Sequence, residues 1–368
     1  MGDRTHTGGS GPWRVLRIIG LVAALLVAAE LALQARAHYR YGQSVFNMVA
    51  SETMYVRDEA TGLRLLRPNR VFGGVSQVIA SNEYGLRSPS IDLKRDPAEM
   101  RIAVLGASTV MGAYAKTNSD TFPALLEKRF EESTGDAGVR VINAGMLGFT
   151  LREQHVLLEH VIAPLQPDVL IIYPGFNDFA RYCMEGTAGK PSRRSRYRLP
   201  TISLPGWVLT VDLLLKNTVS IRDAPVIVPA ASEAKRVDAD TLDLDPYRAS
   251  LLELVQSAKS LVGERVVLST NARSFSTAQD HDTQMRLSET ARHYNQCFDL
   301  ANLHRVYDRH NELLSDVALA VGVYLLDSAD RIPADPRYFS DASHFSAAGE
   351  RLMADLLYGF LRENRLIE

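Results

Sequence analysis

The alternation of short apolar runs with amphipathic segments after residue 101 is the feature that most constrains the fold of this chain. Each run is apolar at consecutive positions, which is typical of a strand buried on both faces of a parallel sheet. The segments between the runs have the periodicity of helices that cover such a sheet. The pattern therefore predicts an α/β domain with a central parallel sheet between two helical layers.

The expected strands are residues 101–105, 139–142, 168–173, 265–270 and 322–326, and the expected helices are 120–130, 151–162, 247–262, 282–320 and 346–361. The alternation stops between residues 183 and 245, where proline and charged residues are frequent, and we interpret this stretch as an insertion. Residues 38–100 are irregular, with turn signals at Pro68-Asn69 and Gly73-Gly74, and we expect an accessory region of short strands there.

A dense apolar block, residues 18–33, lies near the N-terminus and contains one charged residue, Glu30. Extended back to Trp13, it approaches the ~20 residues that span a bilayer, so it predicts a transmembrane anchor. A cleaved signal peptide stays open as the alternative, with an apolar core at Ile18–Ala29 and an A-x-A cleavage site at residues 35–37. A buried core helix fits less well, because the block is apolar all round.

The charges that flank this block bear on its orientation. Arg4, Arg14 and Arg17 precede it and favour a cytoplasmic N-terminus, whereas Arg36 and Arg40 follow it and weaken that preference. Both interpretations place the rest of the chain outside the cytoplasm, in the periplasm. We therefore divide the chain into a cytoplasmic stub with its anchor (1–37), the accessory region (38–100) and the α/β domain with its insertion (101–368).

Composition excludes several other classes of protein. The chain has 41 Lys and Arg against 43 Asp and Glu, a formal net charge of −2 that argues against nucleic-acid binding. Its two cysteines exclude a disulfide scaffold and are too few for a zinc or iron–sulfur site. Cys183 and Cys297 could pair in an oxidising compartment or stay reduced. Neither a phosphate-binding glycine loop nor a dinucleotide fingerprint is present, so we predict no cofactor and no metal.

Ligands bind beyond the carboxyl ends of the strands in an open parallel sheet, so the residues after each strand are the first candidates for chemistry. Ser108 follows the first strand in the turn G-A-S-T, which exposes its hydroxyl and its N–H. Gly145 ends the second strand in N-A-G, where the missing side chain lets the backbone N–H approach a ligand. Asn177 follows the third strand in G-F-N-D and can donate an amide N–H to a developing oxyanion.

A base for the serine is expected just before the last helix. A serine hydroxyl needs a base within ~3 Å, and that base needs a partner to fix its tautomer. His344 and Asp341 have this spacing, because an aspartate three residues earlier in a loop can fold back onto Nδ1. The other histidines in helical patterns are expected on the surface: His155, His160, His281, His293, His304 and His310.

These four blocks, in this order, resemble those of the SGNH hydrolase (GDSL-type esterase) family. Ser108 matches its nucleophile, Gly145 and Asn177 match its oxyanion-hole residues, and Asp341 and His344 match its D-x-x-H block. The resemblance covers about residues 101–362 and implies a flavodoxin-like three-layer α/β/α fold. It also implies that the oxyanion is bound by the N–H groups of Ser108 and Gly145 and by the Asn177 side chain.

One position departs from that family. Ala107 replaces the aspartate of G-D-S, which is a local structural residue in the family, so activity is expected to survive. Residues 82–87, N-E-Y-G-L-R, also look like an N-x-x-G-x-R element that precedes the catalytic domain in envelope-associated members.

Four further side chains are candidates for substrate binding, because they follow strands at the same sheet edge: Arg181, Tyr182, Asn271 and Arg273. The basic run at residues 190–198 could attract an anionic substrate, or it could be a solvated loop balanced by the acidic residues 238–245.

The function that we predict is a membrane-anchored, extracytoplasmic serine esterase that removes acyl groups, in particular acetyl, from a carbohydrate. An O-acyltransferase would use the same residues and differ only in what receives the acyl group. A catalytically inactive carbohydrate-binding or assembly protein is the alternative from another class. No nucleic-acid partner is expected, and the sequence does not identify protein partners.

Overall fold

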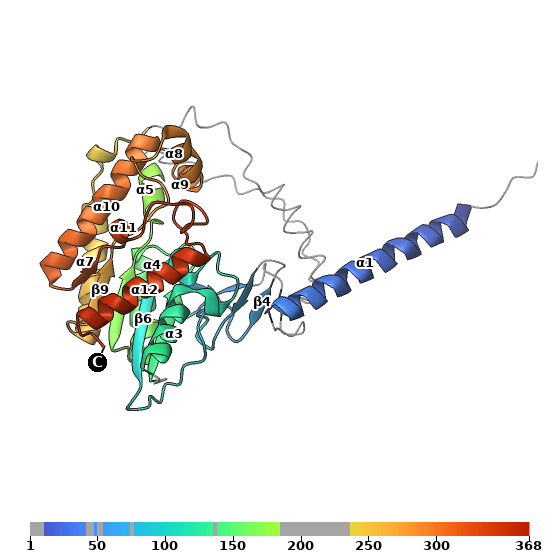
Figure 1. The fold of residues 1–368 in the computed structure, drawn as a ribbon, viewed down its shortest axis with the longest axis horizontal. Helices are drawn as coiled ribbons and strands as arrows, with labels where there is room; N and C mark the ends of the chain where they lie inside the picture. The colour runs from blue at the N-terminus through green and yellow to red at the C-terminus, as the bar shows by residue number, and fades with distance from the viewer. Residues whose placement is uncertain are drawn as a thin grey trace, which may run out of the picture.

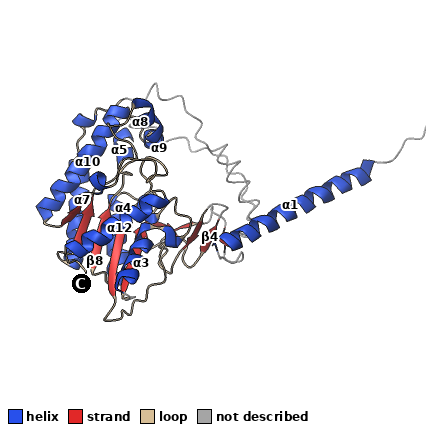
Figure 2. Cartoon of the chain, in the orientation of Figure 1, coloured by secondary structure: helices blue, strands red, loops and turns tan. Residues whose placement is uncertain are grey.

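A five-stranded parallel sheet is the centre of the fold (Figures 1 and 2). The computed structural model describes residues 11–41, 48–49, 54–73, 77–134, 138–184 and 236–367. The strand order is β10-β9-β8-β6-β7, and every pair is parallel. The strands are β6 (Met100–Gly106), β7 (Val139–Gly145), β8 (Val169–Tyr173), β9 (Val266–Ser269) and β10 (Tyr324–Leu326). The prediction of an α/β domain with a central parallel sheet is confirmed.

Helices cover both faces of this sheet. One layer contains α4 (Leu151–Leu157), α7 (Asp245–Val262) and α10 (Leu300–Val321), and the other contains α3 (Phe122–Thr134) and α12 (Ala347–Glu363). Side chains of β6 alternate between the two hydrophobic clusters, with Leu105 in the first and Val104 in the second. This two-residue alternation explains why a strand buried on both faces is a continuous apolar run in the sequence.

The expected helix at 282–320 is in fact three helices, α8 (His281–Leu287), α9 (Glu289–Tyr294) and α10. The main break is at residues 295–299, where the Asp299 side chain accepts the Asn302 N–H and so begins a new helix. The prediction of one long helix was wrong because this cap lies inside a stretch that keeps its helical periodicity. The shorter helices are α2 (Ser108–Met111), α5 (Phe179–Met184) and α11 (Ser328–Arg331).

A disulfide joins Cys183, in α5, to Cys297, in the break before α10, with 5.3 Å between their Cα atoms. It answers the question that the sequence left open about these two residues. It ties the residue at which the insertion begins to the segment just before α10. The interior of that insertion, including the basic run at 190–198, lies outside the described residues.

Two of the histidines expected on the surface are buried. The His310 side chain is fully buried among Phe179, Tyr182 and Tyr247, and burial lowers its pKa to about 4. His304 is 6% exposed and hydrogen bonds through Nε2 to Gln284. Both lie on the face of α10 that packs against α7 and the sheet, so the expectation of exposed positions, which treated a histidine in a helix as a surface residue, was wrong for these two.

The accessory region forms two hairpins and packs onto the domain. Its strands are β1 (Met48–Val49), β2 (Tyr55–Arg57), β3 (Arg64–Leu66), β4 (Val71–Gly73) and β5 (Val78–Ala80). β2 pairs with β3 and β4 with β5, both antiparallel. Leu66, Phe72 and Leu86 are buried in the same hydrophobic cluster as α4 and α7. The region therefore shares the core of the α/β domain.

The N-terminal helix α1 (Gly11–Tyr41) projects away from the rest of the described chain (Figure 1). Its segment Trp13–Ala35 is long and apolar enough to cross a membrane, and none of that window is buried against the protein. Such a helix is a candidate transmembrane span, and a signal sequence near the N-terminus has the same properties.

Glu350 connects the two helices of the second layer. Its carboxyl group, on α12, is 1% exposed and accepts the N–H of Phe122 at the start of α3, at 2.7 Å. Burial raises the pKa of Glu350 to about 8, despite that hydrogen bond and the nearby charge of Arg87. The folded state therefore holds a proton on Glu350 at pH values where the unfolded chain has lost it.

We predict that this proton makes stability depend on pH. Between about pH 4.5 and pH 8 the folded state binds more protons than the unfolded state at this site, so the free energy of unfolding falls as the pH rises. Glu350→Gln keeps an acceptor for Phe122 and removes the titration. Urea unfolding of the full chain in detergent at pH 5, 6.5 and 8 should show a flatter dependence in the variant, by a few kcal/mol at ~1.4 kcal/mol per pKa unit. Parallel pH curves for the two proteins would contradict the prediction.

Candidate active site

The strand β6 and the short helix α2 place Ser108 at the carboxyl edge of the sheet. Ser108 is the first residue of α2 and is 8% exposed. As the first helical residue it has an N–H with no acceptor inside the helix, so this N–H is available to a ligand. Ala107 occupies the cap position and makes no side-chain capping bond.

Ser108, His344 and Asp341 form a continuous chain of hydrogen bonds. The Oγ of Ser108 lies 2.7 Å from Nε2 of His344, and Nδ1 of His344 lies 2.7 Å from Oδ2 of Asp341. A carboxylate can only accept, so the proton between the last two belongs to Nδ1, and Nε2 faces the serine as an acceptor. The structure thus brings the three predicted residues into the geometry of a nucleophile, a general base and its orienting acid.

The loop that carries Asp341 holds its carboxylate in place. Oδ1 accepts the N–H groups of Ser343 and His344, each at 2.9 Å, so the loop folds back on itself. Burial raises the pKa of Asp341, but the hydrogen bonds from His344 and Ser343 outweigh it and hold the pKa below its usual value. Asp341 therefore stays ionised beside the imidazole.

Tyr114 is a fourth member of this group that the sequence did not indicate. Its hydroxyl lies 3.2 Å from Oδ2 of Asp341, and its ring centroid is 5.5 Å from that of His344. The tyrosine side chain is 53% exposed, beside His344 and Asp341. Partial burial and the neighbouring Asp341 raise the pKa of Tyr114 to about 12, so the hydroxyl keeps its proton and donates a hydrogen bond to the carboxylate.

Gly145 does not have the geometry expected of an oxyanion donor. Its N–H donates to Oδ1 of Asn143 at 3.0 Å and is therefore occupied. A Cβ at this position would lie 2.1 Å from the backbone nitrogen of Met111, so the glycine is needed for close packing of α2 against β7. The assignment of Gly145 to the oxyanion hole is thus corrected to a packing role.

Gly148, three residues further along the same loop, has the properties that Gly145 lacks. It is exposed, its φ of +80° favours glycine, and a Cβ there would meet no atom within 4 Å. Among the described residues its N–H has no hydrogen-bond acceptor. The next residue, Phe149, accepts a hydrogen bond from Nδ2 of Asn177 at 2.9 Å, which places Gly148 close to Asn177. A second glycine in N-A-G-M-L-G was the signal available in the sequence.

The loop that carries Asn177 is held by two neighbours. Oδ1 of Asn271 accepts the N–H of Gly175 at 2.9 Å, and Oδ2 of Asp178 accepts the N–H of Leu151 at the start of α4, at 3.2 Å. Burial raises the pKa of Asp178 to about 6. One N–H of the Asn177 amide serves Phe149, and its second N–H is left for a ligand.

The candidate substrate-binding residues mostly serve the protein itself. Asn271 is buried beneath Gly175, and the hydroxyl of Tyr182 lies 3.2 Å from Nε2 of the buried His310. Arg273 pairs with Asp308 at 2.8 Å and donates to the carbonyl groups of Phe275 and His304. These three predictions are corrected to structural roles, because strand-end position alone does not give the direction of a side chain. Arg181 is exposed on α5, and its contact with substrate stays a prediction.

The described part of the chain has no candidate metal site. No group of three or more His, Cys, Asp or Glu side chains there could hold a metal ion.

The sheet order, the two helical layers and the serine site define an α/β/α serine ester hydrolase. The family model described as GDSL-like Lipase/Acylhydrolase matches residues 104–352, which is more than half of the chain. The chain therefore belongs to this family of serine carboxylic ester hydrolases. No curated protein gives a significant sequence match.

Several solved structures are similar at low sequence identity. Axe2, an acetylxylan esterase from Geobacillus stearothermophilus, is 18% identical, with 72% of this chain and 93% of that chain covered and a TM-score of 0.41. LAE5, an alpha/beta hydrolase enzyme from the metagenome of Lake Arreo, is 16% identical, with 73% and 96% covered and a TM-score of 0.43. The lipase/acylhydrolase from Enterococcus faecalis is 18% identical, with 72% and 96% covered and a TM-score of 0.41.

We predict that Asn177→Ala lowers kcat on an activated acetyl ester by about 10²- to 10³-fold, the usual loss for one oxyanion donor. KM should change little, because the amide is needed mainly when charge develops on the substrate oxygen. Steady-state kinetics with the full chain in detergent would measure this. The matched control is Arg152→Ala, which removes an exposed side chain of α4 and should leave kcat unchanged. A kcat within twofold of the parent for Asn177→Ala would exclude the amide from the oxyanion hole.

Proposed function

We propose that Ser108, His344 and Asp341 are the catalytic triad of a membrane-anchored, extracytoplasmic enzyme that removes acyl groups, in particular acetyl, from a carbohydrate. The hydrogen-bonded chain from Ser108 through His344 to Asp341 is the observation that carries this proposal. Such an aligned chain favours catalysis over carbohydrate binding alone, because binding does not require it.

The geometry supports a two-step mechanism. Oγ of Ser108 attacks the ester carbonyl carbon while Nε2 of His344 takes its proton, and Asp341 stabilises the imidazolium that forms. The tetrahedral intermediate collapses, the sugar oxygen leaves with the proton from His344, and the acyl group stays on Ser108. Water then attacks the acyl-enzyme with His344 again as the base, which releases the carboxylic acid and restores the serine.

Three donors are proposed for the oxyanion: the N–H groups of Ser108 and Gly148 and the amide of Asn177. The first N–H has no acceptor within α2, and the second has none among the described residues. All three follow strands that end at the same sheet edge. Preorganised donors of this kind stabilise the charge that develops in the transition state.

The exposed ring of Tyr114 beside His344 supports a carbohydrate as the alcohol part of the substrate. An aromatic side chain with one face in water and a polar tip can pack against the apolar face of a sugar ring. The location proposed for the enzyme is supported by the exposed apolar helix Trp13–Ala35 and by the Cys183–Cys297 disulfide. Disulfides persist in oxidising compartments such as the periplasm and are rare in the cytosol.

We predict that Ser108→Ala abolishes hydrolysis of p-nitrophenyl acetate, with a loss of at least ~10³-fold, and abolishes labelling by a fluorophosphonate probe. The parent should prefer acetyl over butyryl and octanoyl esters and release acetate from an acetylated xylo-oligosaccharide. Adding a deacetylated sugar acceptor distinguishes the transferase, which would form a new sugar ester. Full activity in Ser108→Ala would refute the triad, and a preference for octanoyl esters would refute the acetyl assignment.

The location is tested in a Gram-negative host. The full chain should sediment with membranes and resist extraction by carbonate, and protease added to spheroplasts should degrade the α/β domain. A soluble, shortened periplasmic form would indicate a cleaved signal peptide instead of an anchor. The control is a cytoplasmic marker protein, which must stay intact. A domain that the added protease does not reach would contradict an extracytoplasmic site.

A further inference from the structure

The segment that follows the nucleophile helix, residues 112–116, connects two parts of the triad. We call it the post-nucleophile loop. The N–H of Ala113 donates to the carbonyl of Ser108 at 3.0 Å, so the loop closes the single turn of α2. Tyr114, in the middle of the loop, directs its hydroxyl to Asp341. The position of this loop therefore affects both the serine and the acid.

Arg87, from the accessory region, donates hydrogen bonds from every nitrogen of its guanidinium group, most of them to this part of the molecule. Its Nη1 donates to the carbonyls of Met111 and Gly112 at 3.2 and 2.6 Å. Its Nη2 donates to the carbonyl groups of Ala115 and Val78, and its Nε donates to Oδ1 of Asn118. All five N–H donors of the side chain thus have acceptors, and the side chain is 1% exposed.

Two further accessory residues complete the set of contacts. Nε2 of Gln77 lies 3.0 Å from the carbonyl oxygen of Ala113 and 2.8 Å from that of Ala115, and the N–H of Val78 donates to Lys116 at 2.8 Å. Together with Arg87 they occupy the carbonyl groups of residues 111, 112, 113, 115 and 116. The residue between these carbonyls is Tyr114.

The N-x-x-G-x-R element at residues 82–87 explains how the Arg87 side chain is directed at α2. Oδ1 of Asn82 accepts the N–H groups of Tyr84 and Leu86, both at 3.0 Å, which folds the segment into a tight turn. Gly85 has a φ of +71°, and a Cβ there would lie 2.4 Å from the carbonyl oxygen of Leu66. The turn buries Leu86 in the core and leaves Arg87 directed at α2.

We propose that the accessory region positions the catalytic residues. Gln77 and Arg87 are positioning residues that hold the post-nucleophile loop in place. Through this loop they fix Ser108 and the hydrogen bond from Tyr114 to Asp341. The inference rests on the proposed function, since it assumes that Ser108 and Asp341 belong to the triad. A helix of one turn cannot stabilise itself, so α2 depends on the groups that satisfy its last carbonyls. The accessory region supplies these groups from a different part of the chain.

Tyr114→Phe tests the contact between the post-nucleophile loop and Asp341 of the triad. It keeps the ring and removes the hydroxyl that partly neutralises Asp341. Without this hydrogen bond the Asp341 carboxylate carries more negative charge beside the His344 imidazole. The carboxylate then stabilises the imidazolium more, so the acidic limb of the kcat/KM profile should move to higher pH. The value of kcat/KM on p-nitrophenyl acetate should fall about tenfold. A loss of packing alone would not move the pH profile.

Gln77→Leu tests the contact between the accessory region and the post-nucleophile loop. It keeps the size of the side chain and removes the donors to the loop, so kcat should fall about tenfold while the melting temperature changes little. The double variant Gln77→Leu/Tyr114→Phe should lose far less than the product of the two single losses, because both act through one loop.

Arg87→Lys, which keeps the charge and loses most of the hydrogen bonds, should also lower kcat. Arg70→Ala is the matched control, because Arg70 is exposed and, among the described residues, its guanidinium donates only to the Asn69 carbonyl.

The proposal is overturned if folded Gln77→Leu and Tyr114→Phe both keep the parent kcat/KM and the parent acidic limb. It is also overturned if their effects simply multiply in the double variant. Ser108→Ala and fluorophosphonate labelling, measured in parallel, separate this failure from failure of the proposed function. If Ser108→Ala is inactive while the two variants are fully active, only the positioning role is lost.

Discussion

Parallel pairing aligns the ends of β7, β6 and β8 in one row, and the rest of the site depends on this register. Gly106 lies opposite Gly145 on one side and opposite Tyr173 on the other. The three following loops therefore begin at one level of the sheet edge, and each can direct a group into the same space. A strand slipped by one residue would exchange its two faces and move its loop away from the others.

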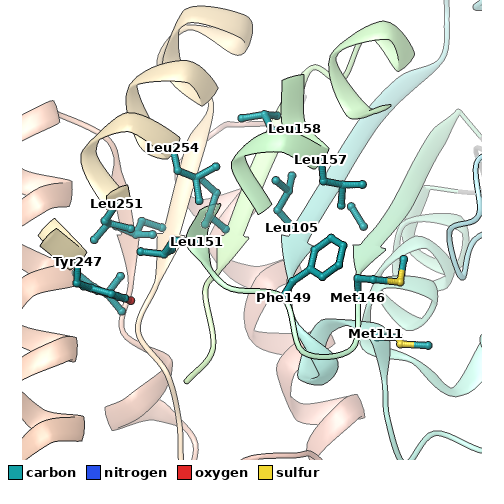
Figure 3. Packing of buried hydrophobic residues seen from close by; sticks show 14 of the residues in the cluster. Leu105, Met111, Met146, Phe149, Leu151, Leu157, Leu158, Tyr247, Leu251 and Leu254 are labelled. Atoms are coloured by element: carbon teal, nitrogen blue, oxygen red, sulfur yellow. The ribbon is translucent and has the colours of Figure 1, made fainter. Parts of the chain in front are cut away.

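Close approach between backbones completes this arrangement. Because Gly145 has no side chain, α2 can lie directly against the end of β7, and the loop after β7 can turn its residues Met146 and Phe149 inward. Figure 3 shows both side chains beside Leu105 and Met111, in the cluster that also contains α4 and α7. The loop that carries Gly148 is thus built on packed apolar side chains.

Much of the fold, and the hydrogen-bonded grouping of Ser108, His344 and Asp341, could be predicted from the sequence, because both leave local patterns. Buried parallel strands are continuous apolar runs, and Asp341 and His344 are three residues apart in one loop. The expectation for Gly145 came from its place at the end of β7, but Gly148 follows the same strand, and only a structure shows that the Gly145 N–H is already occupied by Asn143. Tyr114, Gln77 and Arg87 left no such pattern, since their partners are separated from them in sequence and are mostly backbone carbonyls.

The contacts of Arg87 also favour treating the accessory region and the α/β domain as one folding unit. Removing the region would take away the accessory-region donors to the carbonyl groups of residues 111, 112, 113, 115 and 116 and would expose core residues such as Leu66 and Phe72. The change of pattern near residue 101 is a boundary in the sequence, whereas the hydrophobic cluster and the hydrogen bonds continue across it. Since α1 precedes this region in the chain, the accessory region lies between the candidate membrane span of α1 and the part of the α/β domain that carries Ser108, His344 and Asp341.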